Sequence, residues 1–375
     1  MARQKKMRIQ DVCGLLNQLY PPFLAEDWDH VGLQAGDPLA EVSRVLICLD
    51  VEEKTVAAAV EEKAQLIIAH HPLIFRPLTR ITPQDETGRT LFAALRQGVA
   101  IFCAHTNLDR ASNGLNDWLA TRLGMVNSLP LEHSAGQLLK LVVFVPQGHE
   151  EQVAAALFDA GAGHIGHYDH CAFHSSGTGQ FRPGAATNPF IGQPGVDEKI
   201  AEIRLETIIP AALAARVVQK MCKAHPYEEV AFDLYPLANQ RQDLGLGRIG
   251  FLPAPLAAGD FFTQVKQQLA LDHLRVAGPQ NRLIHKVAVC GGSGVVLMSE
   301  ALRQGADCLV TGDVKYHDAQ RARSEGLTLI DAGHFATEIL MVHPLTQVLT
   351  RAADERQWPV EFIPNKGEQD SFSWI

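Results

Sequence analysis

Short apolar runs alternate with amphipathic segments along the first third of the chain. Residues 44–49, 66–69 and 99–104 are mostly apolar and have the length of buried strands. The segments between them, TVAAAVEEKA and residues 87–97, have the composition and period of helices. This alternation predicts an α/β sheet whose parallel strands are joined by crossover helices.

The same alternation returns near the C-terminus. Residues 287–290, 308–311 and 327–330 are short apolar runs, and VVLMSEALRQGA, between the first two, has a helical pattern. The spacing between the first two strands is the same in both regions of the chain. We therefore interpret the chain as two related three-layer α/β halves. The alternative is that the likeness reflects only what any two strand–helix–strand units share.

The segment between the halves has a different pattern. Residues 137–237 read as strand, helix, strand, a loop rich in glycine and proline (residues 177–195), strand, helix and strand. The order βαββαβ is the ferredoxin-like plan. We predict one discontinuous α/β domain, made by residues 1–130 and 246–375, with an inserted ferredoxin-like α+β domain over residues 131–245.

Composition and charge exclude some classes of protein. The chain has 375 residues, of which 46% are hydrophobic and 20% charged, as in ordinary globular proteins. Its formal net charge of −9 argues against a nucleic-acid partner, because proteins that bind nucleic acids need a basic face. The seven cysteines form no C-x-x-C pair, and no run approaches the roughly 18 apolar residues of a membrane span. We expect a cytoplasmic protein with reduced cysteines and no membrane partner.

Histidines and carboxylates follow the predicted strands in both halves. Ligands of open α/β sheets bind beyond the carboxyl ends of the strands, which is where these side chains should lie. Two adjacent histidines follow the second strand, and a His-x-x-x-Asp or His-x-x-x-Glu pair follows the third strand of each half. The candidate residues are His70, His71, His105, Asp109, His334 and Glu338.

The four-residue spacing of each pair suits metal binding. If a helix begins at His105 and another at His334, then Asp109 and Glu338 lie one turn further along the same helix faces. Imidazole and carboxylate bind zinc, iron, manganese or cobalt, and a carboxylate shared by two ions could hold a hydroxide for hydrolysis. A single histidine at a strand end is more often a hydrogen-bonded structural residue. The joint occurrence in both halves favours the metal site.

Other polar residues have weaker assignments. Asp313, Lys315, Tyr316 and His317 occupy, in the second half, the place of the histidine pair in the first. They are either partners of the metal ligands and proton carriers, or Asp313 or Asp318 simply caps a helix. The glycine-rich residues 290–294 could offer backbone N–H groups to an anion, but they lack the Walker lysine.

The predicted insertion has its own histidine cluster. Its members are His164, His167, His170 and His174. A metal site here is conceivable from composition alone. The segment should, however, pass from a loop into a strand, where neighbouring side chains point to opposite faces. We therefore favour histidines without a shared metal ion.

Several longer motifs resemble one known family. WDHVGLQAGD, AHHPLIF, AHTNLDRASNGLND, VAVCGGSG, TGDVKYHDA and DAGHFATE are similar to the GTP cyclohydrolase I type 2 family, also described as dinuclear metal-centre proteins similar to a yeast NGG-interacting factor. AHPYEEVAFDLYPL and GAGHIGHYDHCAFHSSGTGQFRP resemble the PII-like, or CutA-like, domain that the longer members carry. The resemblance extends over almost the whole chain.

The resemblance implies a site and an assembly. It implies that two divalent metal ions per subunit, of the zinc, iron, manganese or cobalt kind, are bound, with Glu338 as the bridge. The implied ligands are His70, His71, Asp109, His334 and Glu338. His105 ranks just below them, and His30 stands where the family commonly has asparagine. The family is also described as forming ring-like homohexamers whose metal sites face an inner cavity.

The leading hypothesis is a metal-dependent hydrolase with a small-molecule substrate. The resemblance implies a nucleotide such as GTP, with hydrolytic opening of the imidazole ring of guanine, and we assign proton transfer to His317 or His105. The rival hypothesis is a regulatory or metal-handling hexamer, in which the PII-like domain senses a ligand or partner and the metals are structural or stored. A DNA-handling ring is disfavoured by the acidic charge.

Overall fold

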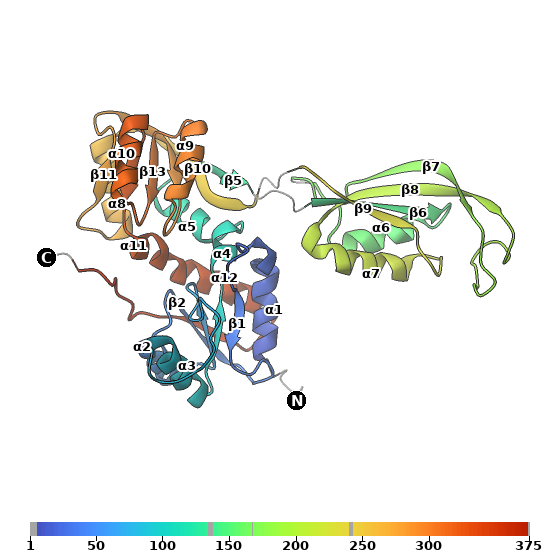
Figure 1. Ribbon diagram of the computed structural model, residues 1–375, viewed down its shortest axis with the longest axis horizontal. Coiled ribbons are helices and arrows are strands. Elements are labelled where there is room, and N and C mark those ends of the chain that lie inside the picture. Colours follow the sequence, from blue (N-terminus) through green and yellow to red (C-terminus); the bar gives the residue numbers. More distant parts are fainter. Residues whose placement is uncertain (1–5, 134–137, 167, 240–242, 374–375) are drawn as a thin grey trace. The chain divides into compact units, whose positions relative to one another are not determined.

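The chain divides into two units, each described here by itself (Figure 1). One unit contains both ends of the chain, Met1–His133 and Asp243–Ile375, and the other is Ser134–Gln242. Among the described residues, no helix has both the length and the apolar character that a membrane crossing needs. The computed structural model describes residues 6–133, 138–166, 168–239 and 243–373.

The first sheet belongs to the N-terminal half of the larger unit. Its strand order is β1-β4-β3-β2-β15. The central strands β2 (Arg44–Cys48), β3 (Leu66–Ala69) and β4 (Ala100–Cys103) are parallel, as their apolar runs predict. Strand β15 (Glu361–Pro364) pairs in parallel with β2, and β1 (Gly32–Ala35) is antiparallel to β4. β3 and β4 are buried at every position, because helices cover both faces of the sheet.

Two helices pack on each face of this sheet. Helices α2 (Glu53–Glu61) and α3 (Glu86–Arg96) share a core with alternate residues of β2, β3 and β4. Helices α1 (Ile9–Leu19) and α12 (Val342–Glu355) share a second core with the intervening residues of the same strands. The first half therefore has three layers, with α12 contributed by the far end of the chain (Figure 1).

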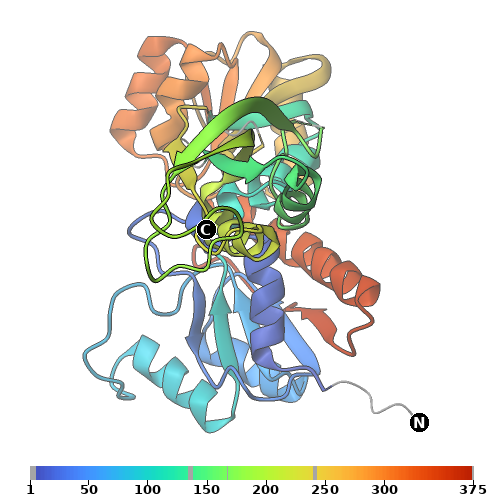
Figure 2. The same ribbon diagram turned by 90° about the vertical axis from the view of Figure 1, so that its right-hand side faces the viewer.

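The second sheet repeats this plan. Its order is β11-β14-β13-β12-β10-β5. Strands β12 (Leu283–Val289), β13 (Cys308–Thr311) and β14 (Thr328–Asp331) are parallel, and β11 (Arg275–Ala277) is antiparallel to β14, as β1 is to β4. The halves differ at the other edge, where β10 (Gly245–Ala257) pairs antiparallel with β12. Figure 2 shows the first half, mostly blue to cyan, below the second half, mostly orange.

Helices also cover both faces of the second sheet. Helices α5 (Leu115–Arg122) and α8 (Ala258–Leu269) share one core with its strands. Helices α9 (Met298–Arg303) and α10 (Tyr316–Glu325) pack on the other side. The larger unit also contains the short helices α4 (Thr106–Arg110) and α11 (His334–Glu338) and the 3-10 turns Pro22–Leu24, Val295–Leu297 and Ile339–Met341.

The chain leaves the larger unit and re-enters it at the same edge of the second sheet, so the smaller unit is inserted there. Strand β5 (Val126–His133) ends where β10 begins, and the two strands pair antiparallel, with His133 opposite Gly245. Two neighbouring strand ends are a position at which a sheet can accept an insertion without a break in its core.

The smaller unit has a sheet of four antiparallel strands in the order β7-β8-β6-β9. The strands are β6 (Leu138–Pro146), β7 (Ala172–Phe181), β8 (Glu198–Pro210) and β9 (Phe232–Pro236). Helix α6 (Glu150–Asp159) follows β6, and α7 (Ala214–Ala224) follows β8. Both helices pack on one face of the sheet and share its core (Figure 1). This is the strand order of the ferredoxin-like plan.

The predicted loop over residues 177–195 is wrong in its first part. Strand β7 continues through Phe181, and it pairs with β8 from Ala172, opposite Thr207, to Phe181, opposite Glu198. The glycines of GTGQF suggested a loop because glycine weakens strands in general. Here the long partner strand β8 supplies hydrogen bonds along the whole segment, so the pairing outweighs the local preference.

Candidate metal centre

Side chains from three separate segments of the larger unit meet at one cluster. They follow β3, follow β4 and lie on α11. The possible ligand atoms of His70, His71 and His105 lie within 4.8 Å of one another, and so do those of His71, His334 and Glu338. His71 belongs to both groups. The two groups are therefore neighbours, and each could hold a metal ion.

The Glu338 carboxylate belongs to the second group and also faces the first. Its Oε2 is 2.9 Å from Nε2 of His71 and 2.9 Å from Nε2 of His334. Its Oε1 is 3.8 Å from Nε2 of His70, and that nitrogen is 3.5 Å from Oδ1 of Asp109. One carboxylate thus presents a different oxygen to each histidine of the adjacent pair. A carboxylate in this position could bridge two ions.

The His70 ring is fixed in the tautomer that a metal ligand needs. Its Nδ1 lies 2.9 Å from the backbone oxygen of Ala104. A carbonyl oxygen only accepts hydrogen bonds, so Nδ1 carries the proton. The neutral ring then presents the lone pair of Nε2 to the cluster. The hydrogen bond with Ala104 also fixes the orientation of the His70 ring, which is completely buried.

Aspartates orient the other three histidines. Each accepts a hydrogen bond from Nδ1 and leaves Nε2 for the cluster, the arrangement usual for metal-bound imidazoles. Asp313 therefore supports a possible ligand, and the helix cap is instead Asp318, which accepts a hydrogen bond from the Lys315 N–H. The pairs are His71 with Asp50 (2.8 Å), His105 with Asp29 (3.0 Å) and His334 with Asp313 (2.7 Å).

Three buried atoms of the cluster have no hydrogen-bond partner among the described residues. They are Nε2 of His70, Oδ1 of Asp109 and Oε2 of Glu338. A buried polar atom without a partner costs about 1–3 kcal/mol. These atoms converge on the same place, and all three are atoms that coordinate divalent cations. The residues therefore fit the two ions that the sequence predicts.

The carboxylates also perturb the titration of the histidines. The adjacent Glu338 carboxylate raises the pKa of His334 to about 9 against the effect of burial. Burial lowers the pKa of His71, but the hydrogen bond with Asp50 and the nearby Glu338 carboxylate outweigh it and raise that pKa to about 10. Burial alone would raise the pKa of Glu338, yet its three histidine neighbours hold it well below its usual value. The cluster is an anionic pocket that attracts either protons or cations.

The glycine-rich loop after β12 makes room for the bridge. The Gly291 N–H donates to Oδ1 of Asn116, and the Gly292 N–H donates to Oγ1 of Thr337. A Cβ atom at Gly292 would lie 2.2 Å from Oε1 of Glu338. The prediction that this loop binds an anion is therefore wrong for these two amides, because they are already used. The loop forms a wall of the cluster.

The two proposed proton carriers have different surroundings. His105 belongs to the group formed with His70 and His71. His317 is exposed on α10, where it contacts the Tyr316 ring and lies 3.1 Å from Oε1 of Gln320. The structure thus places His105 at the cluster and gives His317 contacts with its own helix.

The remaining predicted candidates are exposed or have other contacts. His30 is exposed, and its backbone oxygen accepts a hydrogen bond from Gln34. His170 stacks on Phe158, with ring centroids 4.6 Å apart. His164 and His174 are exposed, and His167 lies outside the described residues. His170 therefore has a packing contact with its own unit.

Sequence reasoning missed two aspartates that orient histidines. Asp50 follows β2 and Asp29 follows Trp28, so a search of all strand ends would have found the first. The Asp50 backbone is itself fixed from a distance, since Oε1 of Glu368 accepts hydrogen bonds from the N–H groups of Leu49 (2.6 Å) and Asp50 (3.0 Å). Only folding brings the C-terminal segment to this strand.

The fold and the cluster define an α/β protein with a carboxylate-centred group of histidines that could bind metal ions. The family model of Duf34/NIF3 (NGG1p interacting factor 3) matches residues 7–370, and the chain belongs to this family. The resemblance seen in the sequence motifs is thereby confirmed.

Relatives share both sequence and fold with the chain. Proteins called GTP cyclohydrolase 1 type 2 homolog are 42% identical in Halalkalibacterium halodurans, over 98% of both chains, and 40% identical in Bacillus subtilis, over 99% of this chain and 100% of that one. A Bacillus cereus protein related to NIF3 has a solved structure with a TM-score of 0.90 and 41% identity, covering 99% of this chain and 100% of that one. Staphylococcus aureus protein SA1388 gives a TM-score of 0.81 and 30% identity over the full length of both.

Proposed function

We propose that the protein is a hydrolase that depends on two divalent metal ions. The ligands are His70, His71, Asp109, His334 and Glu338, with Glu338 as the bridge. The observation that carries this proposal is the position of Glu338, whose two oxygens face different histidines while buried atoms around it lack partners. When bound, such ions lower the pKa of a water molecule towards neutrality and polarise the substrate.

His105 is the proton carrier in this proposal. Its Nδ1 is held by Asp29, 3.0 Å away, so its other nitrogen is available on the side of the cluster. Burial would raise the pKa of Asp29, but hydrogen bonds from His105 and Thr106 outweigh it and lower that pKa to about 2. Asp29 therefore stays ionised and stabilises a proton on His105 when the ring accepts one. His317, which contacts its own helix, is the weaker candidate.

Aromatic side chains beside the cluster support a substrate with a flat ring. The Trp28 ring lies 5.9 Å from the His105 ring and 5.8 Å from the Phe75 ring. Trp28 and Phe75 are 55% and 53% exposed, although large aromatic side chains are usually buried. An exposed ring of this kind can stack on a nucleobase, which every base allows. Together with the names of the relatives, this supports a nucleotide such as GTP as the substrate.

Metal analysis combined with a substrate panel tests the proposal. The purified protein should contain close to two divalent ions per chain and should hydrolyse at least one nucleotide or related heterocycle, with the activity lost on chelation and restored by metal. Glu338→Ala and His334→Ala should each abolish turnover while the protein stays folded. Undiminished turnover by metal-free protein would overturn the proposal.

A regulatory or metal-handling protein is the second candidate, and a cavity in the smaller unit supports it. It predicts bound metal but no turnover on the same panel, together with a ligand response that depends on residues of the smaller unit. Both candidate functions include a homohexamer. Light scattering of the purified protein would test it, and a monomer would contradict it.

A further inference from the structure

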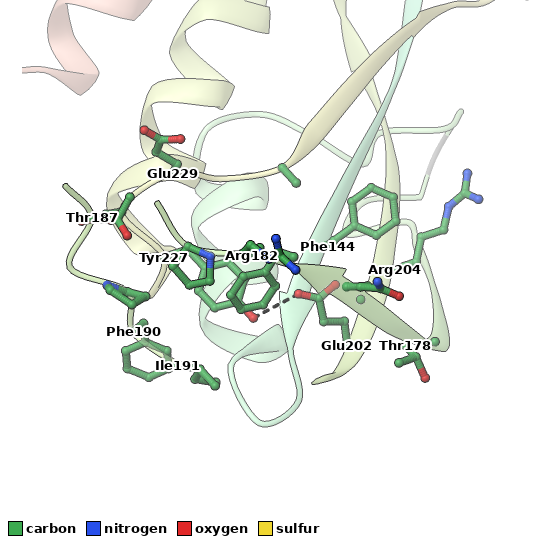
Figure 3. Close-up of a pocket in the computed structure, with 18 of the residues that line it drawn as sticks. Phe144, Thr178, Arg182, Thr187, Phe190, Ile191, Glu202, Arg204, Tyr227 and Glu229 are labelled. Atoms are coloured by element: carbon green, nitrogen blue, oxygen red, sulfur yellow. Dashed lines mark hydrogen bonds between the residues drawn. The ribbon is translucent and has the colours of Figure 1, made fainter. Parts of the chain in front are cut away.

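The smaller unit contains a cavity that the metal chemistry does not use. Its volume is about 630 Å³, within the range of about 300–1,000 Å³ that is usual for small-molecule sites. The cavity is lined by β7, by parts of β6 and β8, and by the segments 182–191 and 227–231 (Figure 3). All of its lining residues belong to the smaller unit, so the cavity can be analysed within that unit alone.

The cavity lies on the face of the sheet that the helices leave open. Val143 and Val145 of β6 and Leu205 of β8 point into the core under α6 and α7. Neighbouring side chains of a strand point to opposite faces, so Phe144 and Glu202 point to the other side. Both of them line the cavity. The segments that connect the strands, rather than helices, therefore cover this face.

Glu202 is the unusual residue of the cavity. It is a carboxylate with only 8% of its surface exposed, and the Tyr227 hydroxyl donates a 3.0 Å hydrogen bond to its Oε1 (Figure 3). A neutral phenol does not balance the charge of a buried carboxylate. The neighbouring strand β7 has a glycine beside this carboxylate, and a Cβ atom at Gly179 would lie 2.0 Å from Oε2 of Glu202. The lack of a side chain at Gly179 therefore leaves space for the carboxylate.

Aromatic rings surround the carboxylate. The Tyr227 ring lies 6.1 Å from the Phe181 ring and 6.3 Å from the Phe190 ring. Figure 3 shows Phe190 and Ile191 on the same side of the cavity as Tyr227. The faces of aromatic rings attract cations, and pockets that combine rings with a carboxylate are suited to ammonium and guanidinium groups.

The arginines of the lining have carboxylate partners of their own. Arg182 forms two hydrogen bonds with Asp197, at 2.6 and 2.8 Å, and Arg204 lies 2.9 Å from Glu206. These arginines are consequently less available to balance Glu202. A phosphate or carboxylate ligand is disfavoured as well, because it would have to approach the buried Glu202 carboxylate.

We propose that this cavity binds a small organic cation with an ammonium or guanidinium head. The N–H groups of the head donate to the Glu202 carboxylate beside the hydrogen bond from Tyr227. The body of the ligand packs against the rings of Tyr227, Phe181 and Phe190. The proposal concerns a second binding site and does not depend on hydrolysis at the metal cluster.

Isothermal titration calorimetry with the full-length protein tests this assignment. The probes are agmatine, spermidine and tyramine as cations, with adenine as a neutral planar base and inorganic phosphate as an anion. We expect saturable binding of at least one cation and none of phosphate. Absence of binding by all three cations would overturn the proposal. Binding of adenine without any cation would also overturn it and would indicate recognition of a neutral base.

Variants locate the binding. Glu202→Gln keeps the shape of the side chain and removes its charge, so it should weaken cation binding by about tenfold or more. Gly179→Ala should also weaken binding, because the added methyl group occupies the place of the carboxylate. Glu151→Gln, an exposed change on α6, is the matched control and should bind as the native protein does. Melting curves verify that each variant is folded.

A further variant separates this site from the metal cluster. Cation binding should survive in Glu338→Ala, whose effect is confined to the larger unit. Loss of binding in that variant, or native affinity in Glu202→Gln, would contradict a site in the smaller unit. Either result would leave the proposed hydrolase untouched, because its test uses turnover.

Discussion

Replacing Asp50 by asparagine should weaken the binding of one of the two proposed metal ions more than that of the other. Asp50 accepts a 2.8 Å hydrogen bond from Nδ1 of His71, whose Nε2 faces Glu338. Asparagine can still accept this bond, but it lacks the charge that makes the imidazole a stronger ligand. His70 is held by a backbone carbonyl instead, so its orientation does not depend on Asp50. The change therefore acts on the His71 side of the cluster.

The exposure of Asp50 sets the size of the effect. A hydrogen bond to a charged group contributes about 1.5–3 kcal/mol. The Asp50 side chain is 47% exposed, so water screens its charge and the lower end of that range applies. A loss of about 1.5 kcal/mol corresponds to roughly tenfold weaker binding of the ion next to His71. This agrees with the tenfold to hundredfold that is typical when such a partner is removed.

Competition with a chelator of known affinity measures both ions in one titration. Asp354→Asn removes an exposed charge on α12 and is the matched control. Each of its two metal-binding steps should have the same affinity as in the native protein. In Asp50→Asn the weaker step should shift by about tenfold while the other moves little. Two unshifted steps would refute the assignment of Asp50 as a positioning residue.

Three further predictions follow from the same unit. Gly292→Ala should lower the metal content of the purified protein, because its Cβ would lie 2.2 Å from Oε1 of Glu338. Gly305→Ala is the control, also at positive φ but with open space around it, and its metal content should be unchanged. Arg248→Met should destabilise the protein by about 3–5 kcal/mol in denaturant titrations. The Arg248 side chain is only 1% exposed and pairs with Asp117, which would lose the partner of its charge. An unchanged midpoint of unfolding would contradict this. The chelated protein should lose stability as pH rises from 6.5 to 10, because the pKa of His71 is raised to about 10 and its protonated form is stabilised in the fold. Metal-loaded protein, whose histidines are neutral, should show a smaller change over that range, and equal slopes would exclude this cause.

The sequence by itself determined the strands and the main candidates for the site. Segments such as LIIA and AIFC are apolar at every position, a pattern typical of short strands that are buried on both faces. The histidines after these strands were identifiable because parallel strands place their carboxyl ends at one edge. The four-residue spacing of His334 and Glu338 on α11 was local information as well. The motifs also sufficed to indicate the family.

Tertiary structure alone decided which groups surround those candidates. Asp29, Asp50 and Asp313 orient histidines that are 21 to 76 residues away in the sequence, a relation that no local pattern carries. The same holds for the strand over GTGQF, which depends on pairing with β8. His70 and His71 reach different oxygens of Glu338 only because α11 and the end of β3 approach each other in the folded unit. Local sequence fixes the conformational preference of a segment, whereas contacts between distant segments decide where its side chains point.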